Sequence, residues 1–297
     1  MVNETFDYVQ YLDVKKNIDD RSLNKAVWND FANWLRARNE LGAELRCLEI
    51  GAGIGTMIER LLEACLLRQC HYIALEPESL FKKAAQVRLN SWANAHGVVF
   101  EINAEGIWSL SGKDLGLTIE WLEADADQIN QLFNKESFDL LLSHAVIDLL
   151  PVPTVMPVIL SKLKQAGGFY FSLNFSGETS FLPSDHSDAG IAKNYHKDMD
   201  TRFPELDWQP SLTGDALPKW LENYGCQKVI NGESDWYLSD KNHPSGDGLF
   251  IKNILDTIKK ALAGMSGLED WLNKRYKQLQ QKQLEIKISN SDCFGLK

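Results

Sequence analysis

The stretch LEIGAGIGT, residues 48–56, decides the fold of this chain. An apolar run ends there in Gly51, Gly53 and Gly55, and a helical pattern follows. A strand that turns sharply into a helix, beside a ligand that approaches the backbone, favours residues without a Cβ. Thr56 stands where the dinucleotide pattern G-x-G-x-x-G has its third glycine, so that pattern is not met. The stretch therefore predicts a strand, a tight turn and a helix, with a ligand held at the turn.

Apolar runs and helical patterns alternate along the first 175 residues. Helices are expected where apolar residues recur at helical spacing, and strands where short apolar or alternating runs occur. A helix begins near Asp20 or Ser22, and a hairpin is expected around Gly112 and Gly116. Such alternation predicts a doubly wound α/β fold with a mostly parallel sheet. The expected strands are residues 45–53, 71–77, 98–103, 117–125, 138–146 and 169–175, and the expected helices are residues 22–38, 54–67, 77–92, 126–134 and 153–165.

The pattern changes after Phe175, where a long polar stretch holds scattered glycine, proline and aspartate. A loop of this length in a compact domain is typically functional or disordered. Further helices are expected at 214–224, 248–264 and 268–282, and strands at 226–231 and 284–289. We therefore divide the chain into an N-terminal helical lid (1–40), a Rossmann-like core (41–175), a cap loop (176–213) and a C-terminal part of the core with two added helices and a final strand (214–297).

Composition narrows the classes of partner. The net charge of −10 disfavours a nucleic-acid partner, because acidic surfaces repel phosphates. Neither an apolar run of spanning length nor a signal-peptide pattern occurs, so we expect no membrane partner. Five cysteines without a C-x-x-C pair are typical of a reducing compartment, so we expect a cytoplasmic protein, as monomer or homodimer.

The glycine turn resembles the first motif of the class I S-adenosylmethionine-dependent methyltransferases. Glu49 stands two residues before Gly51, which gives an acidic residue followed by x-G-x-G-x-G. The resemblance implies a seven-stranded, mostly parallel sheet, S-adenosylmethionine as cofactor and S-adenosylhomocysteine as product. It also implies that the turn contacts the cofactor through Glu49, Gly51, Ala52, Gly53 and Gly55. A tight turn without a ligand and a dinucleotide site remain alternatives.

Two acidic positions extend the resemblance. Glu76, with Pro77 after it, ends the second strand, where a carboxylate accepts hydrogen bonds from ribose hydroxyl groups. Asp125 and Ala126 follow a later strand and look like the family's adenine-recognition step, with Asp127 as an alternative acid. Asp125 or Asp127 is equally suited to cap a helix.

The end of the strand at 138–146 supplies the next candidates. Ser143, His144 and Ala145 occupy positions that line the cofactor in the family. His144 is the candidate general base, because imidazole takes a proton near neutral pH. A structural histidine that only packs on the cofactor is the alternative. Asp148 is interpreted as a helix start.

The lid and the cap supply the remaining candidates. Tyr11, Lys15 and Arg21 precede the first strand and are predicted to reach the methionine end of the cofactor, where Arg21 would pair with the carboxylate. A solvated helix entrance is the alternative for each of the three. The cap resembles that of uncharacterised microbial methyltransferases, a resemblance that does not identify a substrate. The predicted substrate contacts are Asn174, Tyr195, His196, Arg202 and Trp236.

Three functions remain open from the sequence. A small-molecule methyltransferase is favoured, because a long cap and added helices enclose a pocket. A protein or RNA methyltransferase would need an open surface, and a non-catalytic adenosine-ligand binder would lack an acceptor site. The His and Asp residues at 186–200 lack a fixed ligand spacing, so we expect no metal.

Overall fold

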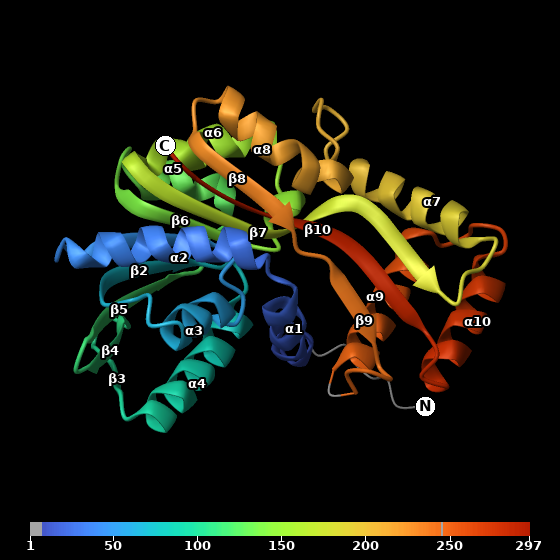
Figure 1. Ribbon diagram of the computed structural model, residues 1–297, viewed down its shortest axis with the longest axis horizontal. Coiled ribbons are helices and arrows are strands. Elements are labelled where there is room, and N and C mark those ends of the chain that lie inside the picture. The colour runs from blue at the N-terminus through green and yellow to red at the C-terminus, as the bar shows by residue number, and fades with distance from the viewer. Residues whose placement is uncertain (1–7, 245) are drawn as a thin grey trace.

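The computed structural model describes residues 8–244 and 246–297, and it contains one ten-stranded sheet with helices on both faces (Figure 1). The strand order is β3-β4-β5-β2-β1-β6-β7-β10-β8, and β9 pairs with β10. The strands are β1 (Leu45–Ile50), β2 (Gln69–Leu75), β3 (Val99–Ile102), β4 (Trp108–Gly112), β5 (Leu115–Leu122), β6 (Phe138–His144), β7 (Leu163–Leu182), β8 (Gln227–Glu233), β9 (Trp236–Ser239) and β10 (Glu285–Leu296).

Five neighbouring strands, β5-β2-β1-β6-β7, run parallel and form the centre of the sheet. Leu48 of β1 lies between Ile73 of β2 and Leu141 of β6, and all three side chains are buried. Strands that are covered on both faces have continuous apolar sequences, and for this reason the sequence predicted them. The carboxyl ends of parallel strands open on one edge of the sheet, where open α/β folds bind ligands.

Antiparallel strands extend the parallel centre on both sides. β10 pairs with β7 and with β8, so the seven strands from β5 to β8 correspond to the sheet expected from the resemblance. The hairpin turn at Gly112 and Leu115 lies near its expected place, but the strand that it joins to β5 is β4, which was not predicted, and the expected strand at 98–103 is β3, on the outer side of β4. β9 was not predicted. It pairs with β10, but its four residues are too few to show the alternation of apolar and polar residues that marks a strand in the sequence.

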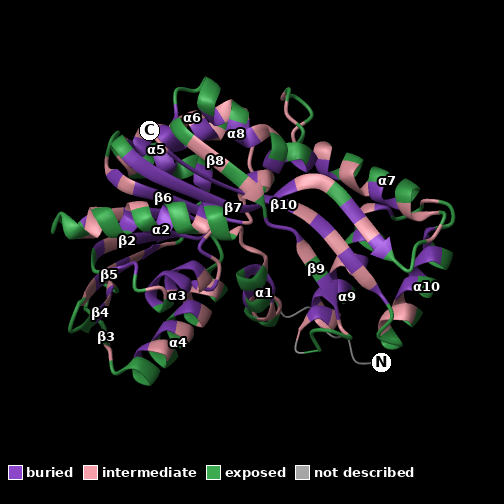
Figure 2. Ribbon diagram, viewed as in Figure 1, coloured by how far each residue is buried: buried purple, intermediate pink, exposed green. Residues whose placement is uncertain are grey.

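The long helices complete the layers (Figure 1). Apolar side chains of α2 pack in one core cluster with β1 and β2, and those of α6 and α8 pack in a second cluster with β6 and β7. Figure 2 shows the purple, buried faces of the helices turned toward the sheet. The helices of at least eight residues are α1 (Tyr8–Ser22), α2 (Lys25–Glu40), α3 (Thr56–Glu63), α4 (Ser79–His96), α6 (Val152–Lys162), α7 (Asp188–Asp200), α8 (Thr213–Asn223), α9 (Asp247–Ala261) and α10 (Leu268–Gln280).

The long strands β7 and β10 continue past the centre of the sheet toward α7, α9 and α10 (Figure 1). A third apolar cluster forms there, and it includes Phe181 of β7, Phe250 of α9 and Ile286 of β10. α1 joins the same cluster through Ile18. This side of the molecule therefore forms a cap of several helices around the far halves of two strands. None of the helices in the described part of the chain is long and apolar enough to cross a membrane.

The structure corrects several expected boundaries. Asn24, and neither Asp20 nor Ser22, caps α2, since its side chain accepts hydrogen bonds from the N–H groups of Ala26 and Val27. Asp20 and Ser22 belong to α1 itself, an element that the polar sequence did not reveal. The stretch 176–213 is no continuous loop, because β7 runs to Leu182 and α7 follows. The final strand is longer than expected and ends at Leu296. Residues 1–7 of the predicted lid lie outside the described residues.

Candidate active site

The glycine turn joins β1 to α3 with three residues of left-handed backbone. The φ angles of Gly51, Gly53 and Gly55 are 71°, 53° and 75°, a region that side chains rarely adopt. A Cβ on Gly51 would lie 2.5 Å from Cγ2 of Val146, whereas one on Gly53 would meet nothing closer than 3.7 Å, the distance to Leu12. Gly51 is therefore needed for close packing against the end of β6, and Gly53 leaves its backbone approachable.

Glu76 ends β2 and turns back toward the glycine turn. Its Oε2 accepts a hydrogen bond from the N–H of Gly53 at 2.8 Å, and its Oε1 accepts one from the N–H of Glu78 at 3.1 Å. The carboxyl group is buried, and burial raises its pKa, while the two backbone hydrogen bonds act against that rise. A carboxylate has about four acceptor positions, so the group keeps acceptor capacity. Pro77, next along the chain, is exposed.

Glu49 lies inside the sheet, where it acts on the turn only indirectly. Its side chain is 1% exposed, and the hydroxyl of Tyr72 donates to its Oε2 at 2.7 Å. Burial raises the pKa of Glu49 to about 8, and the hydrogen bond from Tyr72 and the charge of Arg60 act in the opposite direction. Ser143, also fully buried, donates from its hydroxyl to the carbonyl of Ile50 at 3.1 Å and so fastens β6 to β1.

Asp125 caps the short 3-10 helix at Ala126–Gln128. Its Oδ1 accepts from the N–H of Ala126 at 2.6 Å, and the side chain of Gln128 accepts from the N–H of Asp125 at 2.8 Å. The capping role that the sequence left open is therefore present. Because Ala126 already donates to Asp125, an adenine ring that used the same N–H would have to replace this bond.

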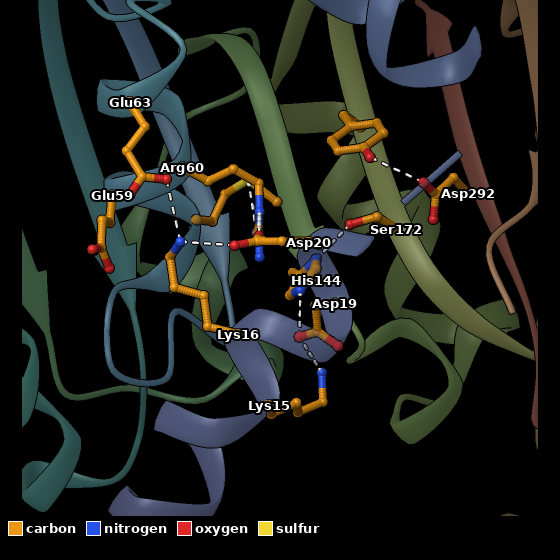
Figure 3. A network of polar contacts seen from close by, with 12 residues as sticks. Lys15, Lys16, Asp19, Asp20, Glu59, Arg60, Glu63, His144, Ser172 and Asp292 are labelled. Carbon is orange, nitrogen blue, oxygen red and sulfur yellow. Dashed lines mark hydrogen bonds and ion pairs between the residues drawn. The ribbon is translucent and has the colours of Figure 1, made fainter. Parts of the chain in front are cut away.

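His144 closes β6 and lies in a buried polar network (Figure 3). Its Nδ1 is 2.7 Å from the hydroxyl of Ser172 on β7, and its Nε2 is 2.9 Å from Oδ2 of Asp19 on α1. Asp19 also accepts from Lys15 at 2.6 Å and from the indole N–H of Trp236 at 3.1 Å. Asp19 therefore links α1 to both β6 and β9.

Burial sets the charge states in this network. It lowers the pKa of His144 to about 4, with the charge of Arg60 acting in the same direction. Burial alone would raise the pKa of Asp19, but Lys15 and the hydrogen bond with His144 bring it down to about 2. A neutral imidazole beside an ionised carboxylate donates from Nε2 to Asp19 and accepts from Ser172 at Nδ1. Both ring nitrogens are therefore committed within the protein.

Ion pairs hold the other side of α1 over α3 (Figure 3). Lys16 contacts Asp20 at 2.8 Å and Glu63 at 3.2 Å, and Asp20 accepts from Arg60 at 2.6 Å. These pairs place α1 beside the glycine turn, where the side chain of Leu12 would lie 3.7 Å from a Cβ on Gly53. The sequence shows that Lys16 and Asp20 lie one helical turn apart, but it does not show that their distant partners are Glu63 and Arg60.

A large cavity opens beside this network, with a volume of about 1110 Å³. α1, α7 and α9 contribute most of its wall, and the segment after β6 contributes Ala145, Asp148 and Leu149. Aromatic side chains dominate its interior, and lysines of α9 lie among its lining residues. The aromatic residues are Tyr8, Tyr11, Phe175, Tyr195, Trp236 and Phe250, and the lysines of α9 are Lys252, Lys259 and Lys260.

The predicted substrate residues divide into two groups. Tyr195, Arg202 and Trp236 line the cavity. His196 lies instead along a separate groove, with its Nε2 3.1 Å from the hydroxyl of Thr179. Asn174 is buried within the sheet, where its amide donates to the carbonyls of Phe171 and Ser291. The structure therefore gives His196 and Asn174 no place on the cavity wall.

The predicted lid residues are also divided. Tyr11 lines the cavity and stacks on Phe250 with ring centroids 5.2 Å apart. Nη2 of Arg21 donates to both carboxylate oxygens of Asp247 at the start of α9, at 2.7 and 2.6 Å. That pair supplies the buried Asp247 carboxylate with its cation, so the guanidinium is already occupied in a contact that fixes α1 on α9.

Asp148 is the cavity residue that the sequence interpretation underrated. It lies in the short 3-10 helix Ile147–Leu149, and its Oδ1 is buried without a hydrogen-bond partner among the described residues. Burial raises the pKa of Asp148 to about 6, and a hydrogen bond from its own backbone N–H and the positive charges of Arg202 and Lys15 act against the rise. Ala145, three residues before it and also in the cavity wall, has a φ of 56°, a left-handed conformation that costs an alanine free energy.

The acidic and histidine residues at 186–200 are dispersed. The exposed imidazole of His186 lies 3.2 Å from Asp185, while Asp188 pairs with the buried Arg275. Asp200 accepts from the backbone and hydroxyl of Ser211. Among the described residues, no group of three or more His, Cys, Asp or Glu side chains is arranged to hold a metal ion.

Comparison with known proteins identifies a family. Residues 27–222 match the model of a family described as "Putative S-adenosyl-L-methionine-dependent methyltransferase". That span includes the glycine turn, Glu76, Asp125 and the end of β6, and it is more than half of the chain. None of the curated proteins matches.

Solved structures give weaker likenesses. A "putative methyltransferase" of Bacillus halodurans C-125 has 12% identity and a TM-score of 0.46, over 88% of this chain and 96% of that one. A Haemonchus contortus phosphoethanolamine N-methyltransferase 2 has 14% identity and a TM-score of 0.43, over 86% of this chain and 49% of that one. An arsenic(III) methyltransferase of Chlamydomonas reinhardtii has 13% identity and a TM-score of 0.40, over 85% of this chain and 63% of that one. At such scores the likenesses carry no argument about this chain.

Proposed function

The chain belongs to the family of S-adenosylmethionine-dependent methyltransferases, and we propose that it methylates a small molecule bound in the cavity between α1, α7 and α9. One observation carries this proposal. The segment from Ala145 to Asp148 touches the glycine turn at Val146 and lines the cavity at both of its ends. The same four residues therefore connect the two places where a donor and an acceptor would lie.

The cofactor residues follow from the geometry of the turn. The turn at Gly51, Ala52, Gly53 and Gly55 offers backbone that no Cβ shields at Gly53. Glu76, held beside Gly53, retains lone pairs that suit vicinal ribose hydroxyls. These features fit S-adenosylmethionine, which supplies a methyl group on a positively charged sulfur. Asp125 and Ala126 would contact the adenine, with the exchange of hydrogen bond described above.

The residues at the end of β6 would border the donor. Ala145 lies at the cavity, whereas Ser143 and His144 are buried and hold the strand in place. We assign His144 a positioning role, because Asp19 and Ser172 occupy its two nitrogens. Methyl transfer depends chiefly on alignment of nucleophile, methyl and sulfur, so fixing β6 and α1 together contributes to the reaction through geometry.

The cavity favours a small acceptor over a macromolecule. Helices α1, α7 and α9 line it together with strands β7, β9 and β10, and its volume of about 1110 Å³ is slightly above the usual range of small-molecule pockets. A protein or RNA acceptor would have to insert a side chain or base between α1 and α9. The net charge of −10 acts further against RNA.

Labelled methyl groups test the acceptor class. Purified protein is incubated with methyl-labelled S-adenosylmethionine and a cell extract split into metabolites, protein and RNA. We expect label in the metabolite fraction. The variant Thr257→Trp, which places a large ring at the exposed α9 wall of the cavity, should reduce that label, whereas Asn194→Trp on exposed α7 surface outside the cavity should not. Label confined to protein or RNA would refute the proposal.

A further inference from the structure

We propose that Asp148 is the catalytic base of the methyl transfer, and that the acceptor atom is a nitrogen or oxygen that carries a hydrogen. This inference rests on the proposed function, since it assumes that the acceptor occupies the cavity. It assigns to Asp148 the task for which the sequence suggested His144.

The position of Asp148 supports the assignment. It follows β6 by four residues, and Val146 between them packs against Gly51 of the glycine turn. Ala145 and Asp148 both line the cavity. A carboxylate on this segment therefore stands at the end of the cavity that adjoins the proposed cofactor site.

The hydrogen bonding of the cavity carboxylates singles out the same residue. Asp148 and Asp256 are the two acidic residues in the described wall of the cavity. Asp256 is paired with Lys252 at 2.9 Å and with the hydroxyl of Tyr276 at 2.5 Å. Oδ1 of Asp148 is buried without a partner among the described residues, and such an oxygen is costly to leave unpaired. An acceptor that donates N–H or O–H would supply the missing bond.

The surroundings of Asp148 match a base. A hydrogen bond from its own backbone N–H and the charges of Arg202 and Lys15 favour the carboxylate form. Lys15 donates to Asp19 at 2.6 Å, and none of the ion pairs among the described residues joins it to Asp148. His144 offers no free nitrogen, because Asp19 and Ser172 occupy both. The carboxylate of Asp148 is thus the acceptor group left available at this end of the cavity.

The reaction then balances without a further reagent. The lone pair of the acceptor nitrogen or oxygen forms a bond to the methyl carbon. The carbon–sulfur bond breaks, and its electron pair stays on sulfur, which becomes the neutral thioether of S-adenosylhomocysteine. The hydrogen of the acceptor atom passes as a proton to the carboxylate of Asp148, which releases it to water after the product leaves.

A cofactor analogue tests the assignment without knowledge of the acceptor. Sinefungin carries an ammonium group near the position of the transferred methyl, whereas S-adenosylhomocysteine has no group at that position. Calorimetry should show that the wild-type protein prefers sinefungin. In Asp148→Asn that preference should fall by about ten- to hundredfold, because a hydrogen bond to a charged group is lost. Asp198→Asn, an exposed aspartate of α7 outside the cavity wall, is the matched control and should keep the preference.

The outcomes separate this inference from the proposed function. An equal preference in the wild type and in Asp148→Asn, or no preference in the wild type, would overturn the assignment of Asp148. Failure of the wild type to bind either ligand would instead refute the proposed cofactor site, and with it this inference. Asp148→Ser, which removes the charge with a smaller side chain, gives the same comparison if the Asn variant does not fold by circular dichroism.

Discussion

Removal of the His144 side chain tests whether this residue fastens α1 to the sheet. In His144→Ala, the buried Asp19 loses the donor at 2.9 Å, and the hydroxyl of Ser172 loses its acceptor at 2.7 Å. A lost hydrogen bond to a charged group costs about 1.5–3 kcal/mol, and an unsatisfied buried hydroxyl costs about 1–3 kcal/mol. We therefore expect the free energy of unfolding to fall by about 2.5–6 kcal/mol, a large part of the usual total of about 5–15 kcal/mol.

Urea unfolding followed by tryptophan fluorescence at pH 7.5 measures this loss. His196→Ala is the control, because His196 is half-buried and makes one hydrogen bond, with Thr179. We expect that variant to lose less than about 1.5 kcal/mol. An equal loss in both variants would contradict the role given to His144. Because the histidine also holds the lid, affinity for S-adenosylhomocysteine and turnover should fall together. A fall in turnover alone would instead identify a base.

The pH dependence of the same variant provides a second check. The pKa of His144 is lowered from 6.5 to about 4 in the folded protein, so the unfolded chain takes up a proton as the pH falls through 6.5 and the folded chain does not. The stability that comes from the neutral imidazole is therefore present above pH 6.5 and is lost by about pH 4. The loss amounts to about 3 kcal/mol. The difference between wild type and His144→Ala should narrow over this interval.

Three further predictions concern other buried or binding groups. Glu76→Ala should weaken binding of S-adenosylhomocysteine by about 1.5–3 kcal/mol in calorimetry, and an unchanged affinity would show that Glu76 is not the ribose ligand. Glu49→Gln should gain stability relative to the wild type between pH 5 and 8, because the pKa of Glu49 is raised to about 8 and the unfolded chain ionises first; a constant difference between the two proteins in thermal melts would refute this. Methyl transfer should continue in a metal chelator, and a loss of turnover restored by a divalent ion would overturn that expectation.

The parallel centre of the sheet was predictable because each of its strands can be recognised from its own residues. Strands such as β1 and β6 are buried on both faces and therefore read as apolar runs. The turn at Gly51–Gly55 was equally visible, because left-handed backbone selects glycine. The position of Glu76, directly after β2, was predicted in the same way.

The cap and the polar network depended on contacts that no local pattern encodes. α1 carries three polar residues in succession at its centre and four at its end. Asp19 is buried only because His144, Lys15 and Trp236 converge on it. The same convergence makes His144 unavailable as a base. The sequence did not show that Arg21 pairs with Asp247, because the two residues lie 226 positions apart in the chain. Arg21 was therefore assigned to a ligand. Asp148 was overlooked because a helix-start aspartate and a cavity aspartate have the same sequence signature.

A crystal structure with S-adenosylhomocysteine tests the central claim most directly. The account predicts the adenosine at Glu76 and Asp125, and the sulfur beside the segment from Ala145 to Asp148, facing the cavity between α1 and α9. A product bound with its sulfur turned away from this segment, or bound outside the glycine turn, would contradict the claim that donor and acceptor meet there.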